Sequence, residues 1–246
     1  MKRFETVYDE DTLNIFTDAS MYNGTYNGYT VGCAGVELAT SILRTDIVTN
    51  LYPNGYIPNY VVTLDTTNNN SELIALRQGL LFAIANKDRF KTINIFSDSL
   101  LSVNSLNDWV QSWFYKSLKN RDWIFRNSSG APVANQDIIK NIMVLIYYND
   151  LRINIYHMRG HCSNNLELVK RDFIKFNQLK DNMVSDLFIK QIADINDIVD
   201  KRSRDIMRNF IRTGYAPYII NNTLIPGIEY DVSGIYFKRY KELIRR

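Results

Sequence analysis

The stretch INIFSDS, residues 93–99, is a short apolar run that closes on an aspartate, Asp98. A second stretch of this kind, IFTDAS at residues 15–20, closes on Asp18. Short apolar runs bounded by polar residues predict buried strands. Carboxylates at the ends of neighbouring strands can converge on one edge of a sheet, which is the usual place for an active site in an α/β fold. The two stretches therefore predict an acidic site at a sheet edge.

Hydrophobic periodicity along the rest of the chain predicts strands followed by alternating helices. Leu73, Leu76, Leu80 and Ala83 recur at helical spacing, and Ser71 is expected to cap that helix. This order of elements predicts an α/β sheet with antiparallel and parallel portions, flanked by helices. The expected strands cover residues 12–16, 30–39, 60–64, 92–96 and 152–156, and the expected helices cover 71–86, 136–148 and much of the segment up to about 210.

The 246 residues suffice for one generous domain or a smaller domain with an appendage. There is no internal repeat, and the softest boundary lies near residues 193–197. After residue 210, glycines and prolines predict a tail rich in loops. We therefore expect a main domain over residues 1–194 and a basic, mainly helical or irregular extension over residues 195–246.

Composition excludes a disordered or membrane-spanning chain. Apolar residues make up 46% and aromatic residues 13%, and no apolar run approaches the length needed to cross a bilayer. The N-terminal residues carry no signal peptide, so we expect a soluble, cytoplasmic monomer without a membrane partner. The net charge of +3 is a weak argument for nucleic-acid binding, although the residues from 201 onward are distinctly cationic. Cys33 and Cys162 fit no metal-binding spacing, and reduced thiols are favoured over one disulfide.

A third carboxylate, Glu72, opens the first helix in TTNNNSEL, residues 66–73. Several carboxylates in one cleft repel each other, so a cation must neutralise them. Mg²⁺ or Mn²⁺ fits a cluster poor in cysteine and histidine far better than zinc does. The competing interpretation is that Asp18, Glu72 and Asp98 are helix caps or solvated surface acids.

The order of these fragments resembles the type 1 ribonuclease H family. The family's first strand ends in Thr-Asp-Gly-Ser, and residues 17–20 read TDAS. Its Thr-Asn-Asn-x-x-Glu-Leu motif is similar to residues 67–73, TNNNSEL, and its Thr-Asp-Ser motif to residues 97–99, SDS. A Gly-His pair at 160–161 and an Asn-x-x-x-Asp spacing at 182–186 follow in the family's order. The resemblance covers roughly residues 13–193.

This resemblance implies a ribonuclease H-like mixed five-stranded sheet and a defined activity. The expected enzyme is an endoribonuclease that cleaves the RNA strand of RNA–DNA hybrids by two-metal-ion hydrolysis, leaving 5′-phosphates. Four carboxylates, Asp18, Glu72, Asp98 and Asp186, are expected to hold two Mg²⁺ or Mn²⁺ ions. Asp181 and Asp194 are nearby competitors for the fourth position. His161, in a loop after a strand, is expected to assist proton transfer or product release.

The resemblance also implies residues that bind the hybrid. Asn68 and Asn69 are expected to contact its backbone and sugars, and Thr67 and Asn135 a DNA phosphate. Residues 109–135 resemble the basic handle of cellular members, and its expected nucleic-acid-binding residues are Trp109, Lys116, Lys119, Arg121 and Arg126. The competing interpretation makes the tryptophans core residues and the cations ordinary surface charges.

The chain departs from the family pattern at several places. Ala19 replaces a glycine, and residues 40–60 and 164–180 are interpreted as insertions. Two other functions remain open: another nuclease of the same superfamily, of the integrase or resolvase type, and a catalytically dead hybrid-binding module. Cleavage of hybrid, duplex DNA and branched DNA would separate them.

Overall fold

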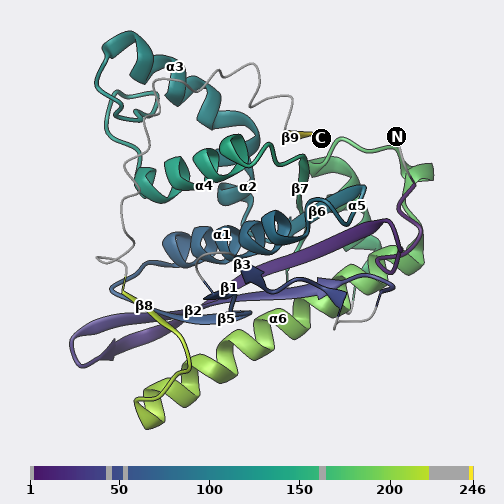
Figure 1. Ribbon diagram of the computed structural model, residues 1–246, viewed down its shortest axis with the longest axis horizontal. Coiled ribbons are helices and arrows are strands. Elements are labelled where there is room, and N and C mark those ends of the chain that lie inside the picture. Colours follow the sequence, from purple (N-terminus) through teal and green to yellow (C-terminus); the bar gives the residue numbers. More distant parts are fainter. Residues whose placement is uncertain (1–2, 43–45, 52–54, 161–164, 222–243, 246) are drawn as a thin grey trace.

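A computed structural model describes residues 3–42, 46–51, 55–160, 165–221 and 244–245 of the chain (Figure 1). Its main feature is a 7-stranded mixed sheet in the order β8-β5-β2-β1-β6-β7-β9. The strands are β1 (Thr12–Tyr26), β2 (Tyr29–Ala39), β5 (Tyr60–Leu64), β6 (Thr92–Ser97), β7 (Ile153–His157), β8 (Ile219–Asn221) and β9 (Ile244–Arg245). The helices are α1 (Asn68–Asn86), α2 (Leu100–Asn104), α3 (Val110–Asn120), α4 (Gln136–Tyr148), α5 (Leu166–Phe176) and α6 (Asp186–Thr213).

Shorter elements connect these. A π-helical turn, Ser105–Trp109, joins α2 to α3, and a 3-10 turn, Asp181–Met183, precedes α6. Strands β3 (Asn50–Leu51) and β4 (Gly55–Tyr56) form a separate antiparallel pair within the expected 40–60 insertion.

Strand β1 is the centre of the sheet. It pairs antiparallel with β2 and parallel with β6, and β6 pairs parallel with β7. Thr17 of β1 lies opposite Ser97 of β6, so the residues that follow each of them, Asp18 and Asp98, lie at the same level of the sheet.

Helices cover both faces of the sheet, with α1 and α4 on one side and α6 on the other (Figure 1). Side chains alternate between the two cores: Ile15 and Ile95 join the core on the α1 side, whereas Phe16 and Phe96 join the core on the α6 side. The Phe16 and Phe96 rings stack with centroids 4.9 Å apart. Burial on both faces explains why these strands appear in the sequence as continuous apolar runs.

The five expected strands are confirmed, and the sheet is extended by two short ones. β8 has 3 residues beside β5, and β9 has 2 residues beside β7. The first expected strand, residues 12–16, ends too early, because β1 continues to Tyr26 and stays paired with β2, with a shift of register between Met21 and Thr25. The actual turn is Asn27-Gly28, with φ of 51° and 84°, and this dipeptide favours the two-residue turns of tight hairpins.

Helix α6 is a single helix of 28 residues that runs through the expected domain boundary near residue 194. Beyond that point Val199, Met207 and Phe210 are buried against the sheet. The helix ends at Gly214, whose N–H donates to the carbonyl of Phe210 at 2.7 Å and whose φ of 69° favours glycine. The folded unit therefore includes the whole of α6. Neither α6 nor any other helix in the described ranges is long and apolar enough to cross a membrane.

Truncation tests the boundary at residue 194. A fragment of residues 1–194 loses Val199, Met207 and Phe210, and each such burial contributes about 1.5–3 kcal/mol. Their sum is comparable with the whole stability of a domain, about 5–15 kcal/mol. We expect this fragment to lack a cooperative thermal transition by circular dichroism, whereas residues 1–221 retain one. If residues 1–194 unfolded cooperatively at the melting temperature of the full-length protein, the boundary at residue 194 would be correct after all.

Candidate metal centre

Three elements bring carboxylates to one point of the sheet. Asp18 lies within β1, Asp98 follows the last residue of β6, and Glu72 lies near the start of α1. Helix α1 approaches β1 closely at Gly79, where a Cβ atom would lie 2.8 Å from Cγ2 of Thr17. This close approach holds α1, and with it Glu72, against β1.

Asp18, Glu72 and Asp98 each contribute one carboxylate oxygen to a group whose atoms lie within 4.8 Å of one another. Asp18 is 3% exposed and Glu72 is 5% exposed, while Asp98 is half-buried. Oδ1 of Asp18 accepts a hydrogen bond from the backbone N–H of Ala19 at 2.7 Å. Oε2 of Glu72 is buried and accepts no hydrogen bond from the part of the chain that the structure describes. The structure thus brings together three of the four expected carboxylates.

Burial and mutual repulsion make these groups hard to ionise. Burial raises the pKa of Asp18 to about 8, and the charge of Asp98 contributes to that rise. Burial also raises the pKa of Glu72 well above its usual range, with further contributions from Asp18 and Asp98. A buried carboxylate oxygen without a partner, in a donor set made only of carboxylates, fits Mg²⁺ or Mn²⁺. The residues present are therefore compatible with a divalent metal site.

Asp186, the expected fourth carboxylate, is not part of this cluster. It begins α6, its side chain is 89% exposed, and its Oδ1 accepts a hydrogen bond from Lys170 Nζ at 2.8 Å. The two competitors considered in the sequence, Asp181 and Asp194, are also exposed. Phe188 and Ile189 fill the buried side of this first turn, and Asp186 lies on its exposed side, so the expectation that Asp186 joins the cluster is corrected.

Asp200 is the acid of α6 that faces the cluster, and sequence reasoning missed it. It is 6% exposed, and its charge raises the pKa of both Asp18 and Glu72. A surface groove has Ala19 and Ser20 of β1 on one wall and Asp200 on the other. The carboxylate also forms an ion pair with Arg204, one turn later on the helix.

A signal for Asp200 was present in the sequence. Asn196 and Asp200 repeat the Asn-x-x-x-Asp spacing of Asn182 and Asp186. Ile192, Ile195 and Val199 recur at helical spacing and mark the side of α6 that packs against the sheet. Asp200 follows Val199 and lies next to that side.

The end of β7 lies directly beside Asp98. A Cβ atom on Gly160 would lie 2.2 Å from Oδ2 of Asp98, so only glycine fits this position without a shift. His157, buried at the end of β7, has Nε2 3.1 Å from the backbone oxygen of Asp98. His161 lies outside the described residues, and its role stays a prediction.

The expected hybrid-binding residues near α1 lie together. Thr67 caps α1 by accepting from the N–H of Asn70 at 3.3 Å, and Asn68 and Asn69 are exposed at the same helix end. Asn135, which precedes α4, accepts from Nδ2 of Asn70 at 3.3 Å. The structure therefore places Asn135 next to the N-terminus of α1, with the exposed residues beside it.

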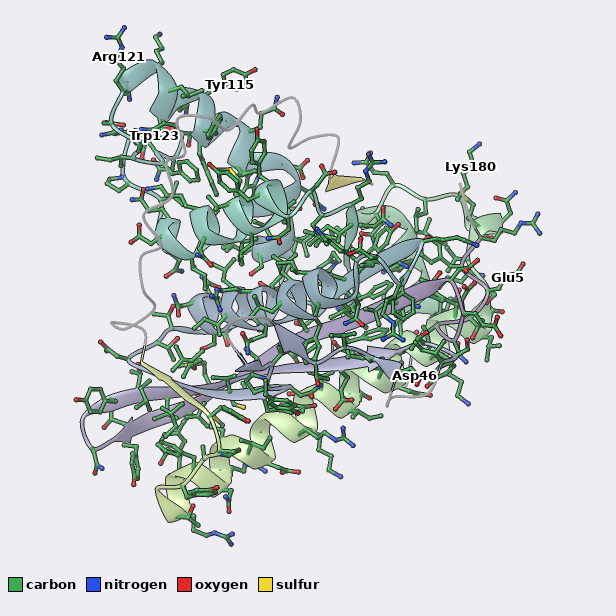
Figure 2. All side chains as sticks on the ribbon, in the orientation of Figure 1. Glu5, Asp46, Tyr115, Arg121, Trp123 and Lys180 are labelled. Atoms are coloured by element: carbon green, nitrogen blue, oxygen red, sulfur yellow. The ribbon has the colours of Figure 1, made fainter. Side chains whose placement is uncertain are left out.

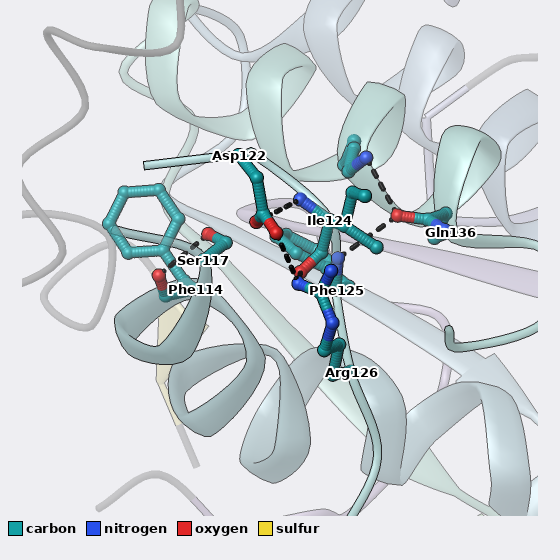
Figure 3. A network of polar contacts seen from close by, with 8 residues as sticks. Phe114, Ser117, Asp122, Ile124, Phe125, Arg126 and Gln136 are labelled. Atoms are coloured by element: carbon teal, nitrogen blue, oxygen red, sulfur yellow. Dashed lines mark hydrogen bonds and ion pairs between the residues drawn. The ribbon is translucent and has the colours of Figure 1, made fainter. Parts of the chain in front are cut away.

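The handle-like segment, residues 109–135, stands away from the sheet and carries Arg121 at its outer tip (Figure 2). Lys116, Lys119 and Arg121 are exposed. Arg126 instead forms an ion pair with Asp122 at 2.6 Å, and Asp122 also accepts from the N–H of Ile124 at 3.1 Å (Figure 3). Lys116 donates to the carbonyl of Asn127 at 3.3 Å, and Arg126 is balanced by Asp122.

The tryptophans of this segment divide between core and surface. Trp113 is buried and packs against Phe125 with ring centroids 6.2 Å apart, and Trp123 packs against Phe114 at 5.9 Å. Trp109 is 42% exposed and lies 6.0 Å from Trp113. The core interpretation holds for Trp113, and Trp109 presents an aromatic surface.

Comparison with known proteins gives a consistent match. The model of the RNase H family matches residues 10–192. The chain is 43% identical over 88 residues to a ribonuclease H of Tropheryma whipplei (strain Twist), covering 36% of this chain and 48% of that protein. It is 32% identical over 98 residues to a ribonuclease H of Syntrophomonas wolfei subsp. wolfei (strain DSM 2245B / Goettingen), covering 39% and 59%. The chain spans about half the length of these curated relatives.

Solved structures give weaker likenesses. LC9-RNase H1, described as a type 1 RNase H with the type 2 active-site motif, is 21% identical and has a TM-score of 0.41, with 67% of this chain and 71% of that chain covered. A foamy viral protease-reverse transcriptase in complex with dsDNA is 18% identical with a TM-score of 0.42, and 72% and 97% of the two chains are covered. Family membership rests on the sequence match.

The raised pKa of Asp18 predicts how stability depends on pH in the metal-free protein. The unfolded chain releases this proton near pH 3.8, whereas the folded protein keeps it until about pH 8. Between these values the folded state binds more protons, so its free energy of unfolding falls as pH rises. We expect the melting temperature in EDTA to fall between pH 5 and 8, and to fall less in Asp18→Asn. Asp186→Asn, an exposed control, should follow the unmutated curve. If melting temperature fell equally with pH in Asp18→Asn and in the unmutated protein, Asp18 would not be a buried carboxyl that keeps its proton in the folded state.

Proposed function

The chain belongs to the RNase H family, and on that premise we propose that it is an endoribonuclease that hydrolyses the RNA strand of RNA–DNA hybrids. The observation that carries the proposal is the cluster of Asp18, Glu72 and Asp98, in which one oxygen from each residue lies within 4.8 Å of the other two. All three residues fall within the part of the chain matched by the family model, residues 10–192.

Four carboxylates would hold the metal: Asp18, Glu72, Asp98 and, in the place expected for Asp186, Asp200. Two Mg²⁺ or Mn²⁺ ions, when bound there, supply Lewis acidity that activates the attacking water and stabilises the leaving 3′-oxygen. The N–H of Ala19 fixes one oxygen of Asp18, and the carboxyl also interacts with that of Asp98 within the cluster. Arg204 balances the charge of Asp200 while the latter is held near the other acids.

The residues at the N-terminus of α1 would bind the two strands of the hybrid. The exposed amides of Asn68 and Asn69 can both donate to and accept from a 2′-hydroxyl, the group that distinguishes RNA from DNA. Thr67 and Asn135 flank a helix N-terminus, where unpaired N–H groups favour a phosphate. These positions are suited to an RNA sugar and a DNA phosphate respectively.

The handle-like segment would add affinity without chemistry. Lys116, Lys119 and Arg121 are exposed, and they would act through phosphates in a salt-dependent way. Exposed Trp109 offers a face on which a sugar or base can pack. Arg126, paired with Asp122, is the least suited of the expected cations to this task.

The acids of α6 give a matched pair of variants. Asp200→Asn removes a buried charge beside the cluster, whereas Asp186→Asn removes an exposed charge from the same helix. Loss of an outer partner of a metal ligand typically lowers activity by about 10–100-fold. Because Asp200 is proposed as a ligand itself, we expect Asp200→Asn to lower kcat on a labelled hybrid by at least about 100-fold. Asp186→Asn should stay within about twofold of the unmutated rate, as surface changes usually do. The reverse ranking would return the fourth position to Asp186.

Metal and substrate dependence test the activity as a whole. We expect cleavage of the hybrid with Mg²⁺ or Mn²⁺, leaving 5′-phosphate and 3′-hydroxyl ends, because both ions accept compact octahedral oxygen sites. Ca²⁺, which is larger and more loosely coordinated, should not support cleavage. Gel analysis of labelled hybrid, duplex DNA and branched DNA provides the measurement. Full activity in EDTA, or cleavage of branched DNA in preference to hybrid, would refute the proposal.

A further inference from the structure

Helix α5 lies in the stretch 164–180, which was interpreted from the sequence as an insertion, and it packs against β6, whose end carries Asp98 (Figure 1). Phe173 of α5 is fully buried, with its ring centroid 6.2 Å from that of Phe96 in β6 and 6.0 Å from that of Tyr156 in β7. The ring of Phe176 lies 4.8 Å from that of His157. The helix is therefore fixed under the ends of β6 and β7.

A side chain at the end of α5 continues the hydrogen bonding of β7. Asn177 accepts from the N–H of His157 at 2.9 Å and donates to the carbonyl of His157 at 2.7 Å. The same amide group donates to the carbonyl of Phe173 at 2.8 Å, which ties it to its own helix. Because Asn177 is 8% exposed, these bonds are shielded from water and are stronger than they would be at the surface.

An ion pair connects α5 to Arg159, two residues after His157. Oδ2 of Asp172 in α5 accepts from Arg159 at 2.5 Å, and the side chain of Asp172 is 8% exposed. Arg159 keeps the pKa of Asp172 below its usual range, and Arg171, 3.5 Å away, contributes. Asp172 is thus held charged beside the residue that precedes Gly160.

Residues 157–160, here called the β7 terminus, form the surface against which Asp98 lies. The N–H of Met158 donates to the carbonyl of Ser97 at 3.0 Å, and Nε2 of His157 lies 3.1 Å from the backbone oxygen of Asp98. Gly160 faces the carboxylate of Asp98 so closely that a Cβ there would be 2.2 Å from Oδ2. A shift of the β7 terminus would therefore move the Asp98 carboxylate.

We propose that α5 is a brace for the metal centre, in which Asn177 and Asp172 are positioning residues that hold the β7 terminus and through it set the place of Asp98. The inference rests on the proposed function, because it takes Asp98 to be a metal ligand. Metal affinity depends steeply on how outer partners orient a ligand.

The competing explanation is that α5 only adds stability, and two pairs of variants separate the two roles. Asn177→Ala removes the bonds to the β7 terminus, whereas Asn165→Ala removes the cap at the other end of α5, where Asn165 accepts from the N–H of Leu168 at 3.1 Å. Asp172→Asn removes the buried charge beside Arg159, whereas Asp181→Asn removes a charge that is 84% exposed. In each pair the control weakens the helix or removes a charge without changing a contact to the β7 terminus.

The measurement is the Mn²⁺ concentration that gives half of the metal-induced rise in melting temperature, which needs no substrate. We expect Asn177→Ala and Asp172→Asn each to raise this concentration about tenfold or more, the range found when outer partners of metal ligands are lost. The two controls should leave it unchanged, even where they lower the melting temperature in EDTA. On hybrid substrate, the brace variants should lower kcat at fixed Mn²⁺ and leave KM unchanged, and excess Mn²⁺ should restore part of the rate.

The outcomes distinguish the brace from the proposed function. The brace is overturned if Asp172→Asn leaves the half-effect Mn²⁺ concentration unchanged. It is also overturned if a variant and its control change this concentration equally. If Asn177→Ala does not fold, Asp172→Asn decides the question. Weakened Mn²⁺ binding in the brace variants, with no hybrid cleavage by the unmutated protein, supports the brace and refutes the proposed function. A protein whose Mn²⁺ response is absent, or unaffected by Asp98→Asn, overturns the brace together with the metal site.

Discussion

Carboxyl groups that crowd together with little access to water repel one another, and the rest of this structure counters that repulsion. One oxygen each from Asp18, Glu72 and Asp98 lies within 4.8 Å of the other two, and two of these residues are almost fully buried. At such separations and in a low effective dielectric, each ionised pair costs several kcal/mol. The two apolar cores on either side of the sheet supply the free energy that holds the strands and α1 in place despite this cost. In the metal-free protein the site is therefore a crowded group of carboxyls, held in place by a well-packed scaffold, in which Asp18 stays protonated up to about pH 8.

The central strands could be predicted because their burial is visible in local sequence. Residues 60–64, 92–96 and 152–156 are short apolar runs, and the structure has strands there. The edge strands β8 and β9 could not be predicted, since they have 3 and 2 residues and depend on parallel partners distant in the chain. The extension of β1 was missed because its second half is polar and becomes a strand only through pairing with β2. Pairing of this kind is a tertiary effect that composition does not reveal.

The metal centre shows the same division. Asp18, Glu72 and Asp98 each follow a local motif, and the structure brings them together. The fourth acid could not be chosen by spacing alone, because α6 offers the same Asn-x-x-x-Asp spacing at Asp186 and at Asp200. Only the rotational phase of the helix, with Val199 and Phe210 on the buried side, separates an exposed acid from a buried one. The dependence of Asp98 on α5 was equally hidden, since it passes through Asn177 and backbone atoms of β7.

The parallel pairing of β1 with β6 governs when the acidic site can exist during folding. Asp18 and Asp98 are 80 positions apart in the chain, and several elements, among them β2, β5 and α1, lie between them in the sequence. The two residues meet only after β1 and β6 have paired. Pairings between distant segments form slowly, because loop closure precedes the contacts that reward it. The β1–β2 hairpin, with its two-residue turn, is local and can form while the chain is still being synthesised. A nascent chain thus carries its first carboxylate on an early hairpin, yet it acquires a place for a cation only once the ribosome has released or extruded β6.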